Sequence, residues 1–351
     1  MSESNAETLI GLVEHYSPSG QEREAVDWLV AHMGRLGYTR AYRDEAGNAV
    51  GVIGDGPKQI VLIGHIDTVP GEIKTRREGD DFYGRGSVDA KGPLACFTDA
   101  VAATGAAPGW QLVVVGAVEE ERDSEGARFA AGVYHPQFAI VGEPNRWDRV
   151  ALGYKGAAWA GLTVRRGVAH TAGQQESACE AAAAVWQRVL EWSASYNQGR
   201  ERAFERVLPT LRAMQSGGDG FEEWARLRIG VRLPVDLAPA AWYQELAGLA
   251  GEAQIEPQGY PLPAHVCDKN TALVRAFLGG IRATGGTPSF VYKTGTADLN
   301  IVGPAWGCPA LVYGPGDSAL DHTPDEHISL DEYAKSVAAL QAALRTLVAG
   351  E

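Results

Sequence analysis

The stretch QIVLIG at residues 59–64 is an apolar, strand-like run that ends directly at His65. Three further runs of this kind are followed by acidic or imidazole side chains: QLVVVGAV at 111–118 before Glu119-Glu120-Glu121, FAIVG at 138–142 before Glu143, and PALVYG at 309–314 before Asp321-His322. In open α/β sheets, ligands bind outside the carboxyl ends of the strands. We therefore predict an α/β fold, in which a central mixed, mostly parallel sheet is flanked by helices and gathers these side chains at one edge.

A fifth position of interest is Asp89, which lies in the glycine-rich loop YGRGSVDAKG at 83–92. Each of the five positions has an ordinary explanation by itself. A histidine after a strand caps a loop, a glutamate pair forms a solvated turn, and an aspartate among glycines makes an Asx-turn. Taken together, a set of histidine and carboxylate side chains at strand ends suits Zn²⁺ or a similar divalent ion.

The composition is that of an ordinary globular protein. The 351 residues predict two domains, and no apolar run approaches the roughly 20 residues that cross a bilayer. A formal net charge of −13 argues against nucleic acid or an anionic membrane as the partner. The four cysteines are widely spaced without a CxxC pair, which predicts reduced thiols and a cytoplasmic location.

Local signals place several further elements. Ser19-x-x-Glu22 and Ser329-x-x-Glu332 each read as a capping box that opens a helix, and a further helix is expected after Gly92, where Pro93 suits a first turn. Residues 49–53, 159–165 and 227–233 are strand-like, and 176–192 and 239–250 are helix-like. Between these helices, 198–220 is polar and rich in glycine at its end, which predicts a flexible or irregular stretch.

The candidate ligands occur before Gly153 and after about Asp268, but not between them. This distribution predicts a metal-binding domain formed by residues 1–153 and 266–351. Residues 154–265 would form a smaller α/β domain inserted into it.

Several segments, taken in chain order, resemble the dinuclear zinc exopeptidases and deacylases, a family that includes acetylornithine deacetylase, succinyl-diaminopimelate desuccinylase and carboxypeptidase G. They are GHIDTVP at 64–70, GRGSVDAKG at 84–92, Glu120-Glu121, GEP at 142–144, and GPG at 314–316 with HTPDE at 322–326. Within that family, SPSG at 17–20, DEAGN at 44–48 and VDAKGPLA at 88–95 most resemble the hydrolases that release lysine and ornithine from a carrier protein.

The resemblance implies two Zn²⁺ ions per chain, with Co²⁺ as a substitute, and a ligand for each position. Asp89 would bridge both ions, and the peptide bond after it would be cis. One ion would be completed by His65 and Glu143, and the other by Glu121 and His322. Asp67, two residues after His65, would hydrogen-bond to that imidazole and fix its tautomer.

The triple Glu119-Glu120-Glu121 needs a choice of register. Ser124 and Gly126 match the family pattern when the functional pair is Glu120-Glu121. Glu120 would then be the general base that takes a proton from water and passes it to the leaving amine, and Glu121 would be a ligand. The other register, in which Glu119 is the base, stays open.

The resemblance also assigns residues outside the metal ligands. The inserted domain would be a lid through which two chains form a homodimer, and His170 would reach the partner subunit's site to steady the oxyanion. Arg232 matches a lid arginine that binds the substrate carboxylate. The segment that contains Gly295 and Thr296 resembles a substrate-contacting loop. A surface histidine, a strand arginine and a turn are the ordinary explanations of these residues.

The function implied is release of L-lysine, and also L-ornithine, from the γ-glutamyl terminus of an amino-group carrier protein in lysine and arginine biosynthesis. The alternatives are a deacylase of small N-acyl amino acids such as N-acetyl-lysine or N-acetylornithine, a dipeptidase, and a metal-binding protein without catalysis. Such carriers are acidic, so a chain of charge −13 would repel them unless basic groups such as 74–77, 165–166 and 200–206 share a surface.

Overall fold

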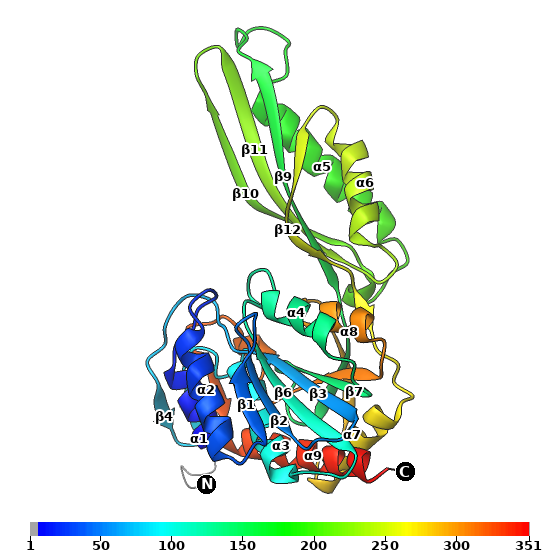
Figure 1. Cartoon of the computed structure of the whole chain (residues 1–351). Helices are drawn as coiled ribbons and strands as arrows, with labels where there is room; N and C mark the ends of the chain where they lie inside the picture. The colour runs from blue at the N-terminus through cyan, green and yellow to red at the C-terminus, as the bar shows by residue number, and fades with distance from the viewer. Residues whose placement is uncertain (1–5, 351) are drawn as a thin grey trace. The chain divides into compact units, whose positions relative to one another are not determined.

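The computed structural model describes residues 6–350 and divides into two compact units. The larger unit contains residues up to 153 together with 267–292 and 297 onward, and the smaller unit contains 154–266 and 293–296. Figure 1 shows the course of the chain through both units. Among the described residues, no helix has both the length and the apolar character that a membrane span needs.

The larger unit is built on a mixed sheet, as the sequence predicts. Within residues 6–350 this sheet has nine strands in the order β1-β2-β6-β3-β7-β15-β8-β13, with β14 paired to β8. Strands β6, β3, β7 and β15 run parallel to one another, while β2 and β8 pair antiparallel with the strands beside them. The strands are β1 (Arg40–Arg43), β2 (Ala49–Ile53), β3 (Lys58–His65), β6 (Trp110–Ala117), β7 (Phe138–Gly142), β8 (Arg149–Tyr154), β13 (His265–Val266), β14 (Ser289–Lys293) and β15 (Ala310–Tyr313).

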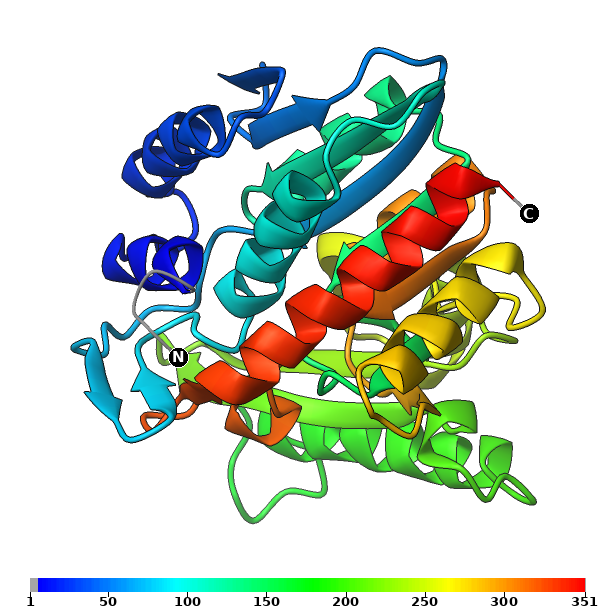
Figure 2. The same cartoon turned by 90° about the horizontal axis from the view of Figure 1, so that it is seen from below.

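Helices flank this sheet. In Figure 2, α3, α9 and α7 lie side by side across one face of the sheet. A small separate sheet contains β4 (Arg76–Glu78), β5 (Asp81–Tyr83) and β16 (His327–Ser329). The helices of the unit are α1 (Glu7–Glu14), α2 (Arg23–Arg35), α3 (Lys91–Thr104), α4 (Glu125–Val133), α7 (Ala272–Ala283), α8 (Leu299–Trp306) and α9 (Leu330–Ala349).

Small residues let α3 approach the sheet next to the predicted ligands. Gly142 is the last residue of β7, and a Cβ atom there would lie 2.9 Å from the ring of Phe97 and 3.2 Å from the Cα atom of Gly64. Any larger residue would therefore push α3 or β3 away. The glycine before Glu143 keeps the carboxyl ends of β3 and β7 close together.

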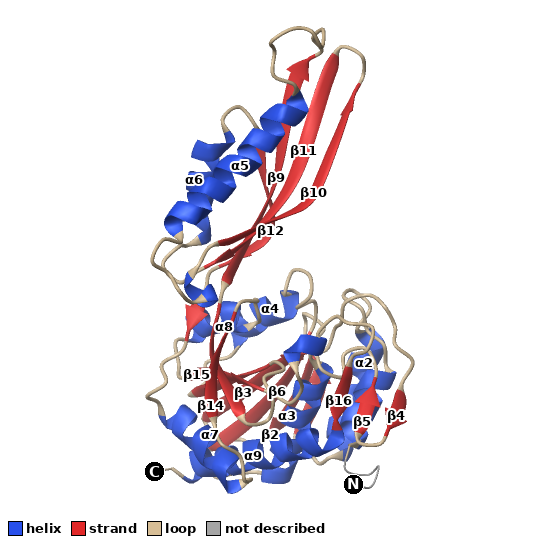
Figure 3. Ribbon diagram, turned by 180° about the vertical axis from the view of Figure 1, so that it is seen from behind, coloured by secondary structure: helices blue, strands red, loops and turns tan. Residues whose placement is uncertain are grey.

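The smaller unit is a four-stranded antiparallel sheet in the order β10-β11-β9-β12, with two helices on one face (Figure 3). Its apolar core lies between that face and the helices, and contains Leu162, Val185, Leu227 and Trp242. The elements are β9 (Gly156–Gly167), α5 (Ala178–Tyr196), β10 (Leu208–Gly218), β11 (Glu222–Leu233), α6 (Pro239–Ala250) and β12 (Gln254–Leu262).

Two local predictions are wrong. The stretch 198–220 is not irregular throughout, because 208–218 forms β10, an edge strand whose exposed side chains conceal the alternation that marks a strand. Ser19 does not cap α2, because its hydroxyl donates to Asp67 Oδ2 at 2.6 Å instead. Ser329 does cap α9, since its Oγ accepts the Glu332 N–H at 3.1 Å.

Candidate metal centre

Three neighbouring parallel strands deliver the predicted ligands to one edge of the sheet. His65 is the last residue of β3, Glu143 directly follows β7, and Glu120 and Glu121 follow β6. Because β6, β3 and β7 are adjacent and parallel, their carboxyl ends lie side by side. The order of strands in the sheet therefore brings together residues that lie up to 78 positions apart in the chain.

The Asp89 carboxylate lies between two imidazoles. Its Oδ1 atom is 3.1 Å from His65 Nε2, and its Oδ2 atom is 3.0 Å from His322 Nε2. His322 Nε2 is also 2.9 Å from Glu121 Oε1. One carboxylate thus has each of its oxygens directed at a different histidine nitrogen, so that Asp89 belongs to two of the groups of predicted ligands. The Asp89–Ala90 peptide bond is cis, as the resemblance implies.

The five predicted ligands fall into overlapping groups. Each group has one potential ligand atom per residue, and all these atoms lie within 4.8 Å of one another. The groups are His65 with Asp89 and Glu143, His65 with Glu120 and Glu121, and Asp89 with Glu121 and His322. The backbone at His322 has φ of 61°, in the left-handed region that costs a non-glycine residue energy and is common at functional sites.

The chemistry of these groups fits divalent cations. His65 Nδ1 lies 2.9 Å from the Asp67 backbone oxygen, which can only accept, so Nδ1 carries the proton. In the neutral ring, Nε2 is then a bare acceptor that faces the acceptor Oδ1 of Asp89. A cation between the two atoms, or a second proton on the ring, resolves this mismatch. The hydrogen bonds to Asp67 and Asp89 outweigh the opposing effect of burial and raise the pKa of His65 well above its usual value.

The crowded carboxyl groups also indicate a site for cations. Burial, together with the neighbouring carboxylates, raises the pKa values of Glu120 and Glu143 well above the usual range. Burial raises the pKa of Asp298 to about 7, and neither of its oxygens has a hydrogen-bond partner among the described residues. Buried acidic groups without donors need positive charge to remain ionised near neutral pH.

The glutamate triple forms a turn that Asp67 holds in place. Asp67 Oδ1 accepts the Glu120 N–H at 3.0 Å, and Oδ2 accepts the Glu121 N–H at 3.1 Å. Glu119 instead has its carboxylate 3.8 Å from the Arg122 guanidinium and joins none of the ligand groups. Asp67 thus holds the turn through its carboxylate, and it contacts His65 Nδ1 through both its backbone oxygen at 2.9 Å and its carboxylate at 3.5 Å.

Sequence reasoning missed Glu326, which holds the Asp89 loop. This fully buried carboxylate accepts the backbone N–H groups of Val88 and Asp89 at 2.9 and 3.0 Å, and its other oxygen accepts Arg85 Nη1 at 2.8 Å. It lies four residues after His322 and so ties the loops of two predicted ligands together. Glu326 closes the quoted HTPDE segment, but only the fold shows which atoms it contacts.

The remaining predicted residues lie in the smaller unit. Arg232, near the end of β11, donates from Nη1 to the Thr296 hydroxyl at 2.9 Å, and Gly295 precedes that threonine. His170 is exposed in the loop between β9 and α5, where its Nδ1 accepts the Ala172 N–H at 3.1 Å. These contacts bring Arg232 and Thr296 together, while His170 belongs to none of the ligand groups within the described residues.

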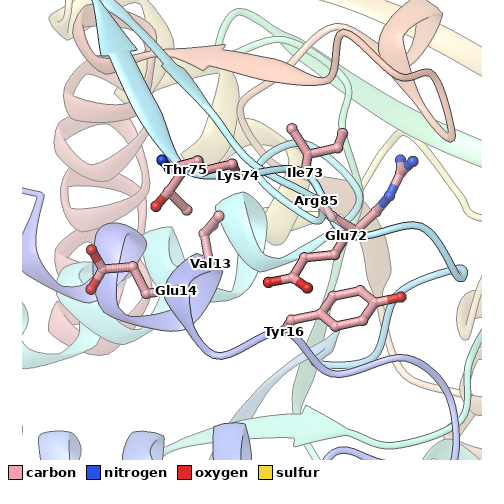
Figure 4. A pocket seen from close by; sticks show the side chains of 8 residues that line it. All are labelled: Val13, Glu14, Tyr16, Glu72, Ile73, Lys74, Thr75 and Arg85. Carbon is pink, nitrogen blue, oxygen red and sulfur yellow. The ribbon is translucent and has the colours of Figure 1, made fainter.

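A separate cavity of about 440 Å³ in the larger unit contains none of the ligand candidates (Figure 4). Arg85 is one of its lining residues, and its guanidinium pairs with Glu326. The other lining residues are Val13, Glu14, Tyr16, Glu72, Ile73, Lys74 and Thr75. The residues that the sequence predicts as ligands and as the acid–base group are not among them.

Comparison with known proteins identifies the family of the chain. Residues 61–346 match the model of peptidase family M20/M25/M40. The chain is 45% identical to "[LysW]-lysine hydrolase" of Deinococcus radiodurans, over 95% of this chain and 94% of that one. It is 39% identical to a putative [LysW]-lysine/[LysW]-ornithine hydrolase of Thermococcus kodakarensis, over 96% and 90%.

The fold agrees with solved structures. An M20 metallo-carboxypeptidase of Sulfolobus solfataricus superposes with a TM-score of 0.81 at 17% identity, covering all of both chains. A dinuclear metal-binding M20 peptidase of Bacillus subtilis superposes with a TM-score of 0.70 at 14% identity, covering 97% of each chain. These findings confirm the resemblance seen in the sequence and the predicted fold class. The chain belongs to peptidase family M20/M25/M40 and is a hydrolase of amide bonds.

Proposed function

We propose that this protein hydrolyses the amide that links L-lysine, and also L-ornithine, to the terminal γ-glutamyl group of an amino-group carrier protein. The observation that carries the chemistry is the Asp89 carboxylate, which lies between His65 and His322. The substrate is supported by relatives of up to 45% identity that are named as [LysW]-lysine hydrolases and align over nearly the full length of the chain. We place the reaction in the cytoplasm, because all four cysteines are free thiols.

The proposed cofactors are two Zn²⁺ ions per chain, for which Co²⁺ can substitute. His65 and Glu143 would hold one ion, Glu121 and His322 the other, and Asp89 both. Ions bound in this way polarise an amide carbonyl and lower the pKa of water to near 7. The ligand set of imidazoles and carboxylates is the one that Zn²⁺ prefers at catalytic sites.

Glu120 is the proposed general base. It lies within 4.8 Å of His65 and Glu121, so a proton acceptor stands beside the ligands. Glu120 takes a proton from the attacking water and returns it to the nitrogen of the leaving lysine, so that the amine departs neutral. Asp67 orients this base through the backbone N–H of Glu120 rather than by touching the substrate.

The smaller unit is proposed to contact the substrate. Arg232 has the planar guanidinium that pairs with a carboxylate through two hydrogen bonds, and it would bind the free α-carboxylate of the amino acid. The Thr296 hydroxyl accepts a hydrogen bond from Arg232, and a Cβ atom at Gly295 would meet no other atom within 4 Å. We name the smaller unit the lid for this role.

We further propose a homodimer formed through the lid. In the described part of the chain, β10 is an edge strand with one unpaired side, and its residues 212–216 are all exposed. Exposed strand edges pair readily with a second chain. His170 would then act in the partner subunit's site. Mixing His170→Ala chains with Glu120→Gln chains tests this: a heterodimer regains activity only if each chain supplies the group that the other lacks.

A hydrolysis panel tests the substrate. The compounds are carrier-linked lysine, carrier-linked ornithine, N-acetyl-lysine, N-acetylornithine and succinyl-diaminopimelate. We expect kcat/KM to be highest for carrier-linked lysine, because contacts with the carrier help to orient the reacting amide. Equal or faster turnover of the small acetylated compounds would replace this function with that of a deacetylase.

A further inference from the structure

One face of the lid sheet is free of lid helices. Helices α5 and α6 cover the opposite face, as Figures 1 and 3 show. Along β11, Ala225, Leu227 and Ile229 belong to the core under these helices. Because side chains alternate along a strand, Arg226 and Arg228 project from the other face.

This second face, which we call the open face, is cationic and aromatic. The Arg226 guanidinium lies 4.7 Å from the ring of Trp224, and the Arg228 guanidinium lies 5.1 Å from that of Trp159. Arg165 of β9 is the register partner of Trp224 and therefore projects from the same face. The open face is defined by Trp159, Arg165, Trp224, Arg226, Arg228 and Arg232.

Carboxylates only partly offset this charge. Glu222 also projects from the open face and lies 3.8 Å from Arg165, and Glu256 of β12 is the register partner of Gly161 on the same face. Within residues 6–350, no carboxylate pairs with Arg226 or Arg228, and both side chains are exposed. Four arginines and two glutamates thus project from the open face, and in the described part of the chain the two central arginines have no carboxylate partner.

Two arginines of the basic runs that stand out in the sequence, Arg166 and Arg200, have carboxylate partners. Arg166 pairs with Glu252 at 2.7 Å and with Glu176 at 3.8 Å. Arg200 pairs with Asp236 at 2.6 Å. These side chains are neutralised by their neighbours, so they present less charge to a partner than Arg226 and Arg228 do.

The charge of the whole chain makes the open face distinctive. The lid contains 12 Lys and Arg and 12 Asp and Glu residues, so the formal charge of −13 belongs to the larger unit. An acidic macromolecule is repelled by the larger unit and attracted to the open face. Local complementarity of this kind steers association even when the net charges of the partners are alike.

We propose that the open face is the docking surface for an acidic protein, with Arg226 and Arg228 as its central contacts. The identity of that protein as the amino-group carrier rests on the proposed function. Arginine and tryptophan are the residues that dominate binding energy at protein interfaces. A guanidinium already stacked on an indole ring also loses less freedom when it pairs with a carboxylate than a mobile lysine does.

Charge reversal tests the proposal. The variant Arg226→Glu/Arg228→Glu is compared with Lys269→Glu/Arg282→Glu, which makes the same charge change at exposed positions of the larger unit. The substrates are carrier-linked lysine and the short amide γ-glutamyl-lysine. We expect the first variant to lower kcat/KM for the carrier substrate about tenfold or more, and to leave the short amide within about twofold. The control should change neither markedly.

Binding of the carrier without its amino acid separates this proposal from the proposed function. Calorimetry should give a Kd that rises about tenfold in Arg226→Glu/Arg228→Glu, with a smaller rise in Arg226→Gln/Arg228→Gln, whose neutral side chains guard against misfolding. If the carrier binds through this face but carrier-linked lysine is not hydrolysed, the proposed function alone is refuted. If Arg226→Glu/Arg228→Glu binds the carrier and hydrolyses carrier-linked lysine as well as the wild type does, the docking surface alone is refuted. Arginine-dependent binding of a single-stranded oligonucleotide, with unchanged carrier kinetics, would also overturn it.

Discussion

The carboxyl group of Asp99 should destabilise the folded protein as it ionises. Asp99 lies on α3, where it accepts hydrogen bonds from the hydroxyls of Thr8 and Tyr333, the second at 2.6 Å. Burial raises its pKa from 3.8 to about 6, despite these two donors and with a smaller contribution from Glu7. Because the pKa of Asp99 is higher in the folded protein, the protonated carboxyl stabilises the fold. This stabilisation is complete below pH 3.8 and is lost as the pH rises through about 6.

The size of the effect follows from the shift. The pKa of Asp99 is about 2.2 higher in the folded than in the unfolded protein, and this difference corresponds to at most roughly 3 kcal/mol of unfolding free energy. Roughly 1.4 kcal/mol of that is lost between about pH 5 and about pH 8. The variant Asp99→Asn stays neutral throughout, so over this range its stability should rise by that amount relative to the wild type.

Urea unfolding of both proteins in the presence of a chelator, followed by tryptophan fluorescence, measures the difference. All other titrating groups are shared by the two proteins and cancel in it. Asp55→Asn, at an exposed loop position, controls for the substitution itself. A difference between wild type and Asp99→Asn that is the same at both pH values, or that moves in the opposite direction, would show that this reasoning is wrong.

Three further predictions concern the metal centre. Glu120→Gln should keep both metals and lose about 10²–10⁴-fold in kcat. Glu121→Gln should instead bind one of the two metals more weakly. Elemental analysis measures the metal content of each variant, and kinetics measures its kcat. If Glu119→Gln is the inactive variant that keeps its metals, the register is off by one. Asp89→Ala should hold fewer than two ions per chain and lose activity with its circular dichroism unchanged; full occupancy would exclude the bridge. Glu326→Gln should leave Arg85 buried without its charge partner. This variant should therefore lose metal to a chelator faster than Asp325→Asn, a control at an exposed position. Equal rates of metal loss would show that Glu326 does not position the Asp89 loop.

Much of the fold follows from the local sequence. The strands at 49–53 and 138–142 and the helix at 239–250 have the predicted bounds, because apolar runs and turn residues report burial directly. The strand ends and the glycine-rich loop that hold the five ligand candidates were predicted in the same way, and the resemblance to the family implied which residue is the ligand at each of them. A strand at the edge of a sheet carries no such signal, and for that reason β10 was missed.

Only the tertiary structure decided which groups meet. Ser19 could have capped a helix, and it binds Asp67 instead because β3 brings that carboxylate within 2.6 Å. Glu326 and Asp298 acquire their surroundings from segments far away in the chain. Arg226 and Arg228 look like ordinary strand residues until the sheet places each beside a tryptophan. The sequence by itself determined the fold class and the kinds of side chain at the strand ends, because apolar periodicity is local, and the resemblance of its motifs indicated the family. The contacts between loops, and the charge of a whole face, depend on the order and pairing of strands, which no local window contains.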